Sequence, residues 1–246
     1  MTRHFSAVLA IAALSFAAPS FASPESIAKA VNDSSRPAAD RAADARRLPY
    51  KTILFSGVKE GDVVGEFLPG GGYYTRMLSD VVGPKGKVYA LETTRWGQGN
   101  IDATKAVSSE KGHENVKFDA SAFGEFNLPE KVDVFWTTLN YHDLHIAKYG
   151  TVDMAAFNRH VFDSVKPGGT YFIVDHVANA GTTDAQIADL HRIDKDVVIK
   201  EVEAAGFQLA SESGVLHRSA DDHAKTVFDK SIQGHTDQFM LKFKKP

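Results

Sequence analysis

Hydrophobic residues along this 246-residue chain gather in short apolar runs, which polar, helix-forming segments separate. Three such runs, residues 63–67, 87–91 and 131–137, are rich in apolar β-branched or aromatic residues and are short enough to be buried strands. A helix is expected over residues 73–82, because Gly83 and Pro84 stop the helical pattern there. Strands that alternate with helices predict an α/β fold with a mostly parallel sheet.

The end of the chain predicts how this sheet closes. Residues 190–213 indicate a helix that Gly206 ends, followed by a strand, and residues 237–244 alternate as a final strand after a long insert. This order favours an antiparallel hairpin, whereas a dinucleotide-binding fold would repeat a second parallel half. The other expected elements are helices at 26–31, 37–47, 50–56, 97–111 and 155–164, a strand at 116–118, and a turn followed by a strand within 165–176. Residues 23–47 are expected to form an N-terminal helical extension or lid, and residues 48–246 one domain.

A glycine turn between the first strand and its helix is the strongest sign of a ligand site. The turn consists of Pro69, Gly70, Gly71 and Gly72. Glycines let the backbone turn sharply and approach a ligand closely, and the N-terminus of the following helix offers unpaired N–H groups to an anion. Glu92 follows the second strand about 20 residues later, where a carboxylate accepts hydrogen bonds from ribose hydroxyls. Thr75 stands where an NAD fingerprint has its third glycine, which weakens an oxidoreductase interpretation.

Glu66 ahead of the string PGGGYYT, then GKVYALE, resembles the first two motifs of class I S-adenosylmethionine (SAM)-dependent methyltransferases. The resemblance spans roughly residues 46–244. It is closest to an exported bacterial group of predicted methyltransferases, through the strings PGGGYYT, NYHD, KPGG, VDH and LHRID. It implies a Rossmann-like, seven-stranded, mostly parallel sheet with an antiparallel C-terminal strand, and SAM as the cofactor.

The same resemblance implies roles for the residues around the turn. Glu66 would lie near the methionine end of the cofactor, the glycines would pass under it, and Glu92 would hold the ribose. Asp119, followed by Ala120, would bond the adenine amine, although an ordinary loop acid explains Asp119 as well. Asn140, after the fourth strand, is also assigned to the cofactor.

Polar side chains after the fourth and fifth strands are the candidates for catalysis, since ligands bind outside the carboxyl ends of strands in open α/β sheets. His142 is the first candidate for a general base, because a histidine pKa lies near neutrality. Asp143 either orients His142 or caps the next helix, and His176, with Asp175 beside it, is a second candidate.

Three further residues are expected at the substrate. Tyr141 is singled out among the aromatic residues as a contact for the sulfonium or a flat acceptor. His191 and Arg192 are expected to bind substrate or to brace their loop.

Four histidines are also candidates for metal ligands. His142, His145, His176 and His191, with Asp143 or Asp175, offer nitrogen and oxygen ligands. Spacing alone does not select such a site: the His-x-x-His string follows a strand instead of lying on an evident helix, and the chain has no cysteine. No metal site is therefore expected.

The composition and the N-terminal residues indicate where the protein is located and which partners it has. A net charge of −3 shows no basic surplus, so a small-molecule substrate is expected and a nucleic-acid partner is not. Residues 1–22 combine Arg3, a short apolar run and a small-x-small site at Ser20 and Ala22, which predicts a secretory signal peptide cleaved after Ala22. The apolar run is too short for a comfortable transmembrane span, although an uncleaved anchor is the alternative. The expected location is the periplasm or the exterior.

The favoured function is SAM-dependent methylation of a small molecule. The alternative is a non-catalytic exported protein that keeps the methyltransferase-like fold and binds a small ligand. Export supports that alternative, whereas the intact acids and glycines oppose it.

Overall fold

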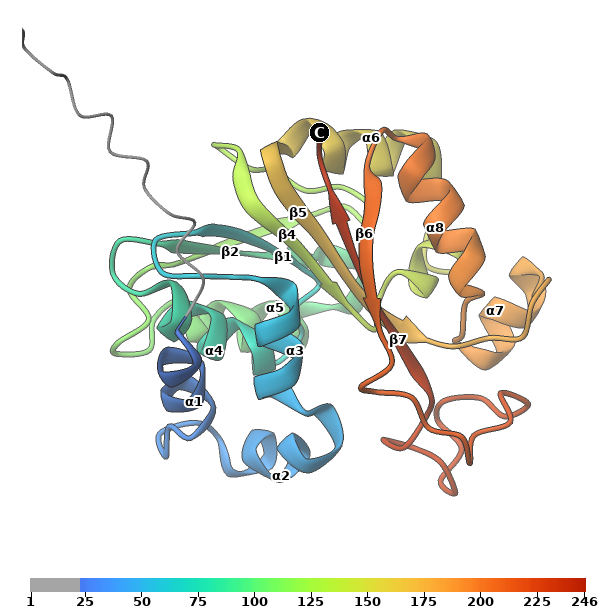
Figure 1. Ribbon diagram of the computed structural model, residues 1–246, viewed down its shortest axis with the longest axis horizontal. Coiled ribbons are helices and arrows are strands. Elements are labelled where there is room, and N and C mark those ends of the chain that lie inside the picture. Colours follow the sequence, from blue (N-terminus) through green and yellow to red (C-terminus); the bar gives the residue numbers. More distant parts are fainter. Residues whose placement is uncertain (1–22) are drawn as a thin grey trace, which may run out of the picture.

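A seven-stranded, mostly parallel sheet runs through the protein (Figure 1). The structure is a computed structural model that describes residues 23–246, and the expected signal peptide lies outside the described residues. The strands are β1 (Val63–Phe67), β2 (Lys87–Thr93), β3 (Val116–Ser121), β4 (Val132–Thr138), β5 (Val165–His176), β6 (Gln208–Ser213) and β7 (Gln238–Lys244). Their order is β3-β2-β1-β4-β5-β7-β6, with β7 antiparallel to both of its neighbours. This is the class I methyltransferase fold, so the expected terminal hairpin is confirmed.

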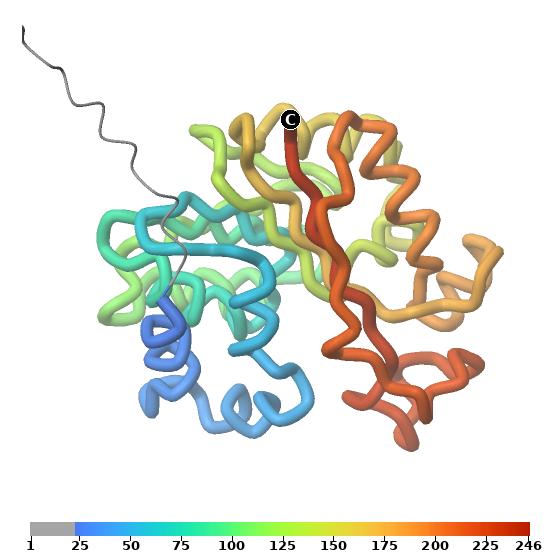
Figure 2. Tube along the Cα trace, viewed as in Figure 1, coloured from blue at the N-terminus to red at the C-terminus, as the bar shows by residue number. Residues whose placement is uncertain are grey.

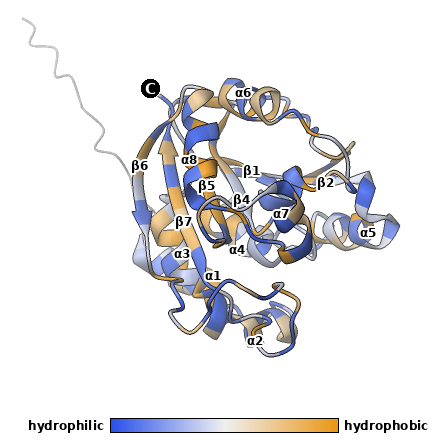
Figure 3. Ribbon diagram, turned by 90° about the vertical axis from the view of Figure 1, so that its right-hand side faces the viewer, coloured by the Kyte–Doolittle hydropathy of each residue, from blue (hydrophilic) through white to orange (hydrophobic). Residues whose placement is uncertain are grey.

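Helices cover both faces of the sheet (Figures 1 and 3). They are α1 (Pro24–Val31), α2 (Ala38–Arg47), α3 (Pro49–Ser56), α4 (Tyr73–Val82), α5 (Gln98–Val107), α6 (Met154–Ser164), α7 (Asp184–Leu190) and α8 (Lys195–Ala204). Tyr171 and Ile173 of β5 pack in the core under α6, α7 and α8, whereas Phe172 and Val174 pack in the core under α1, α3, α4 and α5. A strand covered on both faces is buried along its whole length, as all five residues of β1 are.

Several elements differ from the expected ones. Strands β2 and β3 run further than the apolar pattern indicated, so Glu92 and Asp119 lie within paired strands. The KPGG segment belongs to β5 instead of forming a separate turn. Its Gly169 is required by packing, because a Cβ there would lie 2.6 Å from the side chain of Val165. Helix α5 is shorter than expected, and α7 was not predicted.

Two segments lie beyond the carboxyl edge of the parallel strands. One is α2, and the other is residues 214–237 between β6 and β7, here named the insert (Figure 2). They touch each other, since Nη2 of Arg218 in the insert donates to the carbonyl of Arg46 in α2 at 2.8 Å. Together they cover the strand ends where ligands bind in such sheets. Within residues 23–246, no helix has the length and apolar character that crossing a membrane requires.

Candidate active site

A cavity of about 430 Å³, here named the glycine-turn cavity, lies between the turn after β1 and helix α2. Pro69, Gly70 and Gly71 form one wall, and Arg46 and Arg47 of α2 line the other. Its size falls in the range of about 300–1,000 Å³ that is usual for ligand pockets. The N-terminal extension therefore roofs a cavity, as a lid would.

Gly72 fixes the path of the turn and starts helix α4. Its φ of 79° is left-handed, and a Cβ there would lie 2.5 Å from the side chain of Val107 in α5. No side chain caps the first turn of α4, so backbone N–H groups of that turn stay available beside the cavity. This geometry suits the carboxylate of an amino-acid ligand.

Glu66 lines the glycine-turn cavity at the carboxyl end of β1. Its side chain is 2 % exposed, and Oε2 accepts a hydrogen bond of 2.6 Å from the hydroxyl of Thr75. Burial, assisted by the nearby Glu92, raises the pKa of Glu66 to about 7. A cationic ligand group would relieve the cost of ionising this carboxyl.

The side chain of Glu92 lies under α5 and does not line the glycine-turn cavity. One oxygen accepts the Thr93 N–H at 2.8 Å, and the other accepts the Thr104 hydroxyl at 2.9 Å. Thr104 also bonds the carbonyl of Gly70. Its hydroxyl thus makes the contact that a ribose hydroxyl would make. These residues fit SAM, the cofactor that the fold implies. Glu66 and the glycine turn would lie at its methionine end, and α5 covers Glu92, the carboxylate that would accept hydrogen bonds from its ribose.

A second cavity of about 310 Å³, here named the histidine cavity, adjoins the first. Both are lined by Leu139 and Asn140, which form a shared wall. Nδ2 of Asn140 donates to the carbonyls of Leu68 and Thr138 at 3.0 and 2.7 Å, which fixes the wall between the ends of β1 and β4.

The floor and rim of the histidine cavity differ in chemistry. The buried polar side chains are His142, Asp143, His176 and His191. The rim is aromatic, with Trp96, Tyr149 and Phe228. Phe228 comes from the insert, is 57 % exposed, and packs edge-on against the His191 ring at 4.7 Å between centroids. The cavity suits a small, flat molecule with a polar group directed at the floor.

His142 is held by Asp175. Its Nδ1 lies 2.7 Å from Oδ1 of Asp175, whose Oδ2 accepts the His142 backbone N–H at 2.8 Å. Burial by itself would lower the pKa of His142, but the Asp175 carboxylate outweighs burial and raises it above the ordinary value. The orienting acid is therefore Asp175, whereas the sequence analysis considered Asp143 for that role. Asp143 instead lies 3.3 Å from Nε2 of His142.

His176 is a weaker base than its neighbour. Its Nδ1 shares a hydrogen bond of 2.8 Å with the hydroxyl of Thr236. Burial, reinforced by the charges of His142 and Arg192, lowers the pKa of His176 to about 3, although Asp175 opposes this. His176 therefore stays neutral at physiological pH and contributes a hydrogen-bonding wall.

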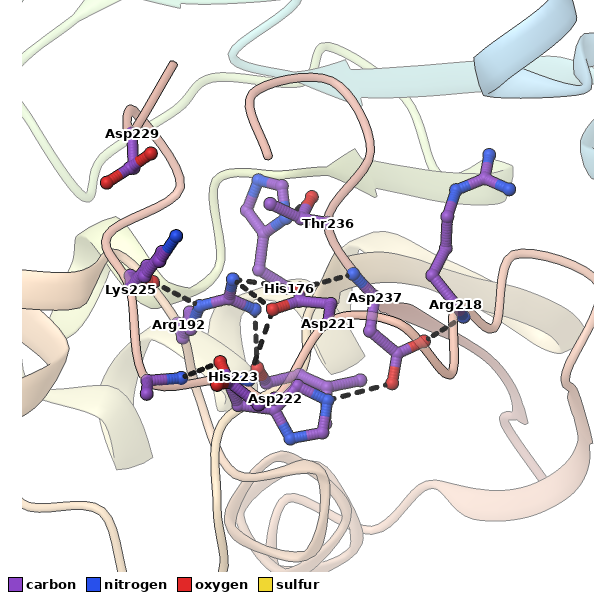
Figure 4. Close-up of polar contacts among 12 residues, drawn as sticks. His176, Arg192, Arg218, Asp221, Asp222, His223, Lys225, Asp229, Thr236 and Asp237 are labelled. Carbon is purple, nitrogen blue, oxygen red and sulfur yellow. Dashed lines mark hydrogen bonds and ion pairs between the residues drawn. The ribbon is translucent and has the colours of Figure 1, made fainter. Parts of the chain in front are cut away.

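Arg192 does not reach the substrate side. It is fully buried and bonds both oxygens of Asp221 at 2.8 and 3.0 Å, together with the carbonyls of Val177 and Lys225 (Figure 4). Asp221 also accepts the backbone N–H groups of His223 and Asp237. Arg192 thus braces the insert, which is the second of the two roles considered for it.

Three other expected contacts also lie outside the cavities. Tyr141 points into the core, where its hydroxyl donates to Glu201 at 2.7 Å and accepts from Asn158 at 2.8 Å. Asp119 accepts the Ser121 hydroxyl at 3.0 Å within β3, and Ala120 pairs with Glu92 across the strands. Neither lines the glycine-turn cavity, because the longer β3 keeps them in the sheet.

No family model matches this sequence, and no curated protein sequence matches it. Among solved structures, a SAM-dependent methyltransferase from Aquifex aeolicus superposes with a TM-score of 0.60 at 20% identity, over 89% of this chain and 97% of that one. Fibrillarin from Aeropyrum pernix, solved with natively bound SAM, gives 0.53 at 17% identity, over 82% and 76%. The cyclase SpnF gives 0.57 at 19% identity, over 87% and 85%. These likenesses establish the class I methyltransferase fold, and a cyclase among them shows that the fold serves more than one reaction.

Proposed function

We propose that this protein is a SAM-dependent methyltransferase that acts on a small molecule. The observation that carries the proposal is the pair of adjoining cavities with one shared wall at Leu139 and Asn140. One cavity has the glycine turn and the buried acid Glu66, and the other has His142 on its floor, with Asp175 buried behind it. A methyl donor in the first cavity and an acceptor in the second would therefore lie next to each other, at the ends of β1 and β4.

The residues of the glycine-turn cavity hold the donor. Backbone N–H groups at the start of α4 would bind its carboxylate, and Glu66 would face its ammonium. Glu92, which lies beside the cavity, would bind its ribose once the Thr104 hydroxyl gives way. SAM, when bound, supplies a methyl group on a positively charged sulfur, which needs little covalent assistance. The protein therefore contributes alignment of the acceptor and activation of its attacking atom.

His142 is the residue that we expect to activate the acceptor. Asp175 accepts the proton on Nδ1, so the ring exchanges its other proton at Nε2, which lies beside Asp143 and His191 on the floor of the histidine cavity. The aromatic rim of Trp96, Tyr149 and Phe228 holds a flat acceptor body above it.

Calorimetric titration of the protein with SAM, S-adenosylhomocysteine and NAD tests the cofactor. We expect micromolar binding of SAM and its demethylated product, and no binding of NAD. Glu92→Gln should abolish SAM binding by removing a ribose acceptor, whereas Glu212→Gln, an exposed acid on β6, should leave it unchanged. His142→Ala should keep SAM binding and lower turnover in an acceptor screen. Binding of NAD alone would overturn the assignment.

We also propose export through the N-terminal signal, on the strength of the apolar run and the site at Ala22. A reporter fused after Ala22 should be active outside the cytosol. A purely cytosolic reporter on a chain that keeps Met1 would refute this proposal.

A further inference from the structure

Three ligand-type atoms on the floor of the histidine cavity lie at the corners of a nearly equilateral triangle. Nε2 of His142 is 3.3 Å from Nδ1 of His191 and 3.3 Å from Oδ1 of Asp143, and the latter two atoms are 3.4 Å apart. All three side chains are buried and belong to one group with metal-binding spacing. The geometry points to a binding site for one divalent transition-metal ion, formed by His142, Asp143 and His191.

The spacing of the triangle agrees with tetrahedral coordination. Zinc lies about 2.0–2.2 Å from nitrogen and oxygen ligands, so two ligands at the tetrahedral angle are about 3.3–3.6 Å apart. The right angles and short bonds of an octahedral magnesium site would bring neighbouring ligands to about 2.8–3.0 Å. The observed separations of 3.3–3.4 Å match the zinc geometry. Two of the three ligands are imidazoles, which suit zinc, whereas magnesium prefers oxygen ligands alone.

Asp175 prepares His142 as a ligand. Its carboxylate lies 2.7 Å from Nδ1, which places the proton there and leaves the Nε2 lone pair directed at the other two ligands. Asp175 is fully buried and is fixed by the backbone N–H groups of His142 and His176. A carboxylate behind a ligating imidazole is the usual outer contact of metal sites, where it orients the ring and strengthens its basicity.

Hydrogen bonding alone explains the triangle less well. Two ring nitrogens and one carboxylate oxygen face one point, and a single shared proton would draw one pair closer than the others. N–H···O contacts centre near 2.9–3.0 Å, about 0.4 Å shorter than those between the three atoms. The contact of His142 with Asp175 shows that short bonds form in this cluster where a proton is shared. A cation at the centre accounts for all three separations at once.

Other nearby histidines stay outside the triangle. Nδ1 of His176 is bonded to the Thr236 hydroxyl, and His145 lies in a separate cavity beside Glu201, with its Nε2 3.3 Å from Oε2. Three protein ligands leave a fourth position open toward the histidine cavity, as in catalytic and not structural zinc sites. The ion is thus placed where an acceptor's polar group would arrive.

The site narrows the acceptor class to molecules with an oxygen ligand, such as a hydroxyl or carboxylate, on a flat body that fits between Trp96, Tyr149 and Phe228. This step rests on the proposed function, whereas the metal site does not. An ion at this position would orient the acceptor oxygen and lower its pKa, so that its proton could pass to solvent water. His142 then acts as a ligand in the loaded protein.

Titration of the chelator-treated, untagged protein with Zn²⁺, without donor or acceptor, tests the site. We expect one Zn²⁺ per chain by calorimetry and elemental analysis, and no comparable binding of Mg²⁺. Bound Co²⁺ should give the intense visible absorption of tetrahedral coordination. Absence of Zn²⁺ binding by a protein with a native circular-dichroism spectrum would overturn the proposal.

Matched variants separate the triangle from incidental sites. His191→Asn removes the imidazole and keeps a residue that tolerates the φ of 54° at this position. It and Asp143→Asn should weaken Zn²⁺ binding by more than about 100-fold, and Asp175→Asn by about 10–100-fold. His145→Asn, at a histidine outside the triangle, should bind as the wild type does; equal losses in His145→Asn and His191→Asn would refute the assignment. Zinc binding without SAM binding would leave the metal site standing and sink the proposed function.

Discussion

Replacing Glu66 by glutamine is expected to stabilise the protein at alkaline pH and to change little in acid. Burial raises the pKa of this carboxyl from 4.5 to about 7. Between those two values the folded protein holds a proton that the unfolded chain has released, so the free energy of unfolding falls as the pH rises through this window. Above pH 7 the folded protein must keep a charge in an apolar surrounding. Glutamine carries no charge, and its carbonyl can still accept the Thr75 hydroxyl.

The size of the effect follows from the same two values. Each pKa unit corresponds to about 1.4 kcal/mol, so the interval from 4.5 to about 7 amounts to about 3 kcal/mol. The gain in unfolding free energy from Glu66→Gln should therefore be about 2–3 kcal/mol larger at pH 8 than at pH 5.

Urea denaturation of the wild type and the variant at pH 5 and pH 8, followed by circular dichroism, measures this difference. Glu130→Gln is a suitable control, because Lys87 lowers the pKa of that exposed carboxyl and its replacement should cost stability at pH 8. An equal gain from Glu66→Gln at both pH values would refute the reasoning, since it would mean that Glu66 is already ionised at pH 5. The variant should also bind SAM more weakly, because it no longer offers a charge to the ammonium group.

Three further substitutions test other parts of the structure. Thr104→Ala should tighten SAM binding several-fold in calorimetry, because the ribose no longer competes with the Thr104 hydroxyl for Glu92. A net hydrogen bond of this kind contributes about 1 kcal/mol. Weaker binding would show that Thr104 helps to hold the ligand. Arg192→Met should lower the unfolding free energy by about 3–5 kcal/mol in denaturant titration, because Asp221 keeps a buried, unpaired charge; a loss below 1 kcal/mol would contradict the bracing role. Phe228→Ala should leave the melting temperature unchanged and raise the KM of the acceptor, because this ring is exposed at the rim of the histidine cavity; a lowered melting temperature would assign it to the core.

Strand and helix positions near the glycine turn could be predicted closely from the sequence. Strand β1 and helix α4 have the expected bounds, because a β-branched run and a glycine stop are both local signals. Helix α7 and the single turn at His142–His145 were missed, since such short helices depend on their surroundings more than on propensity. The ends of β2 and β3 were placed too early, because polar residues such as Glu92 can continue a strand when neighbouring strands supply hydrogen bonds.

The location of the candidate site could be predicted from the sequence, but the contacts between its side chains could not. The carboxyl ends of β4 and β5 had to meet, so His142 and His176 were expected there. Which acid would hold His142 depended on side-chain directions that the sequence does not contain, and Asp175 holds it. Tyr141 and Arg192 were assigned to substrate because polar groups near strand ends often face ligands, yet both find buried partners.

The aromatic rim of the histidine cavity was missed for a related reason. Tyr149 and Phe228 lie in loops without a recognisable motif. Only the fold brings these two residues and Trp96 to one cavity. A long insert between two predicted strands was the one available signal, because loops of that length in compact domains are commonly functional.

The sheet order has a consequence for how the protein is made. Strand β7 lies between β5 and β6 in the sheet, yet it follows both of them along the chain and therefore leaves the ribosome after them. Until residues 238–244 emerge, one edge of β5 has no partner, and an open apolar edge is prone to pair with other chains. The insert, which carries Phe228, has no strand to anchor its C-terminal end until β7 is in place. A nascent or truncated chain without β7 therefore has an open sheet edge that is prone to aggregation, and the seven residues of β7 close that edge.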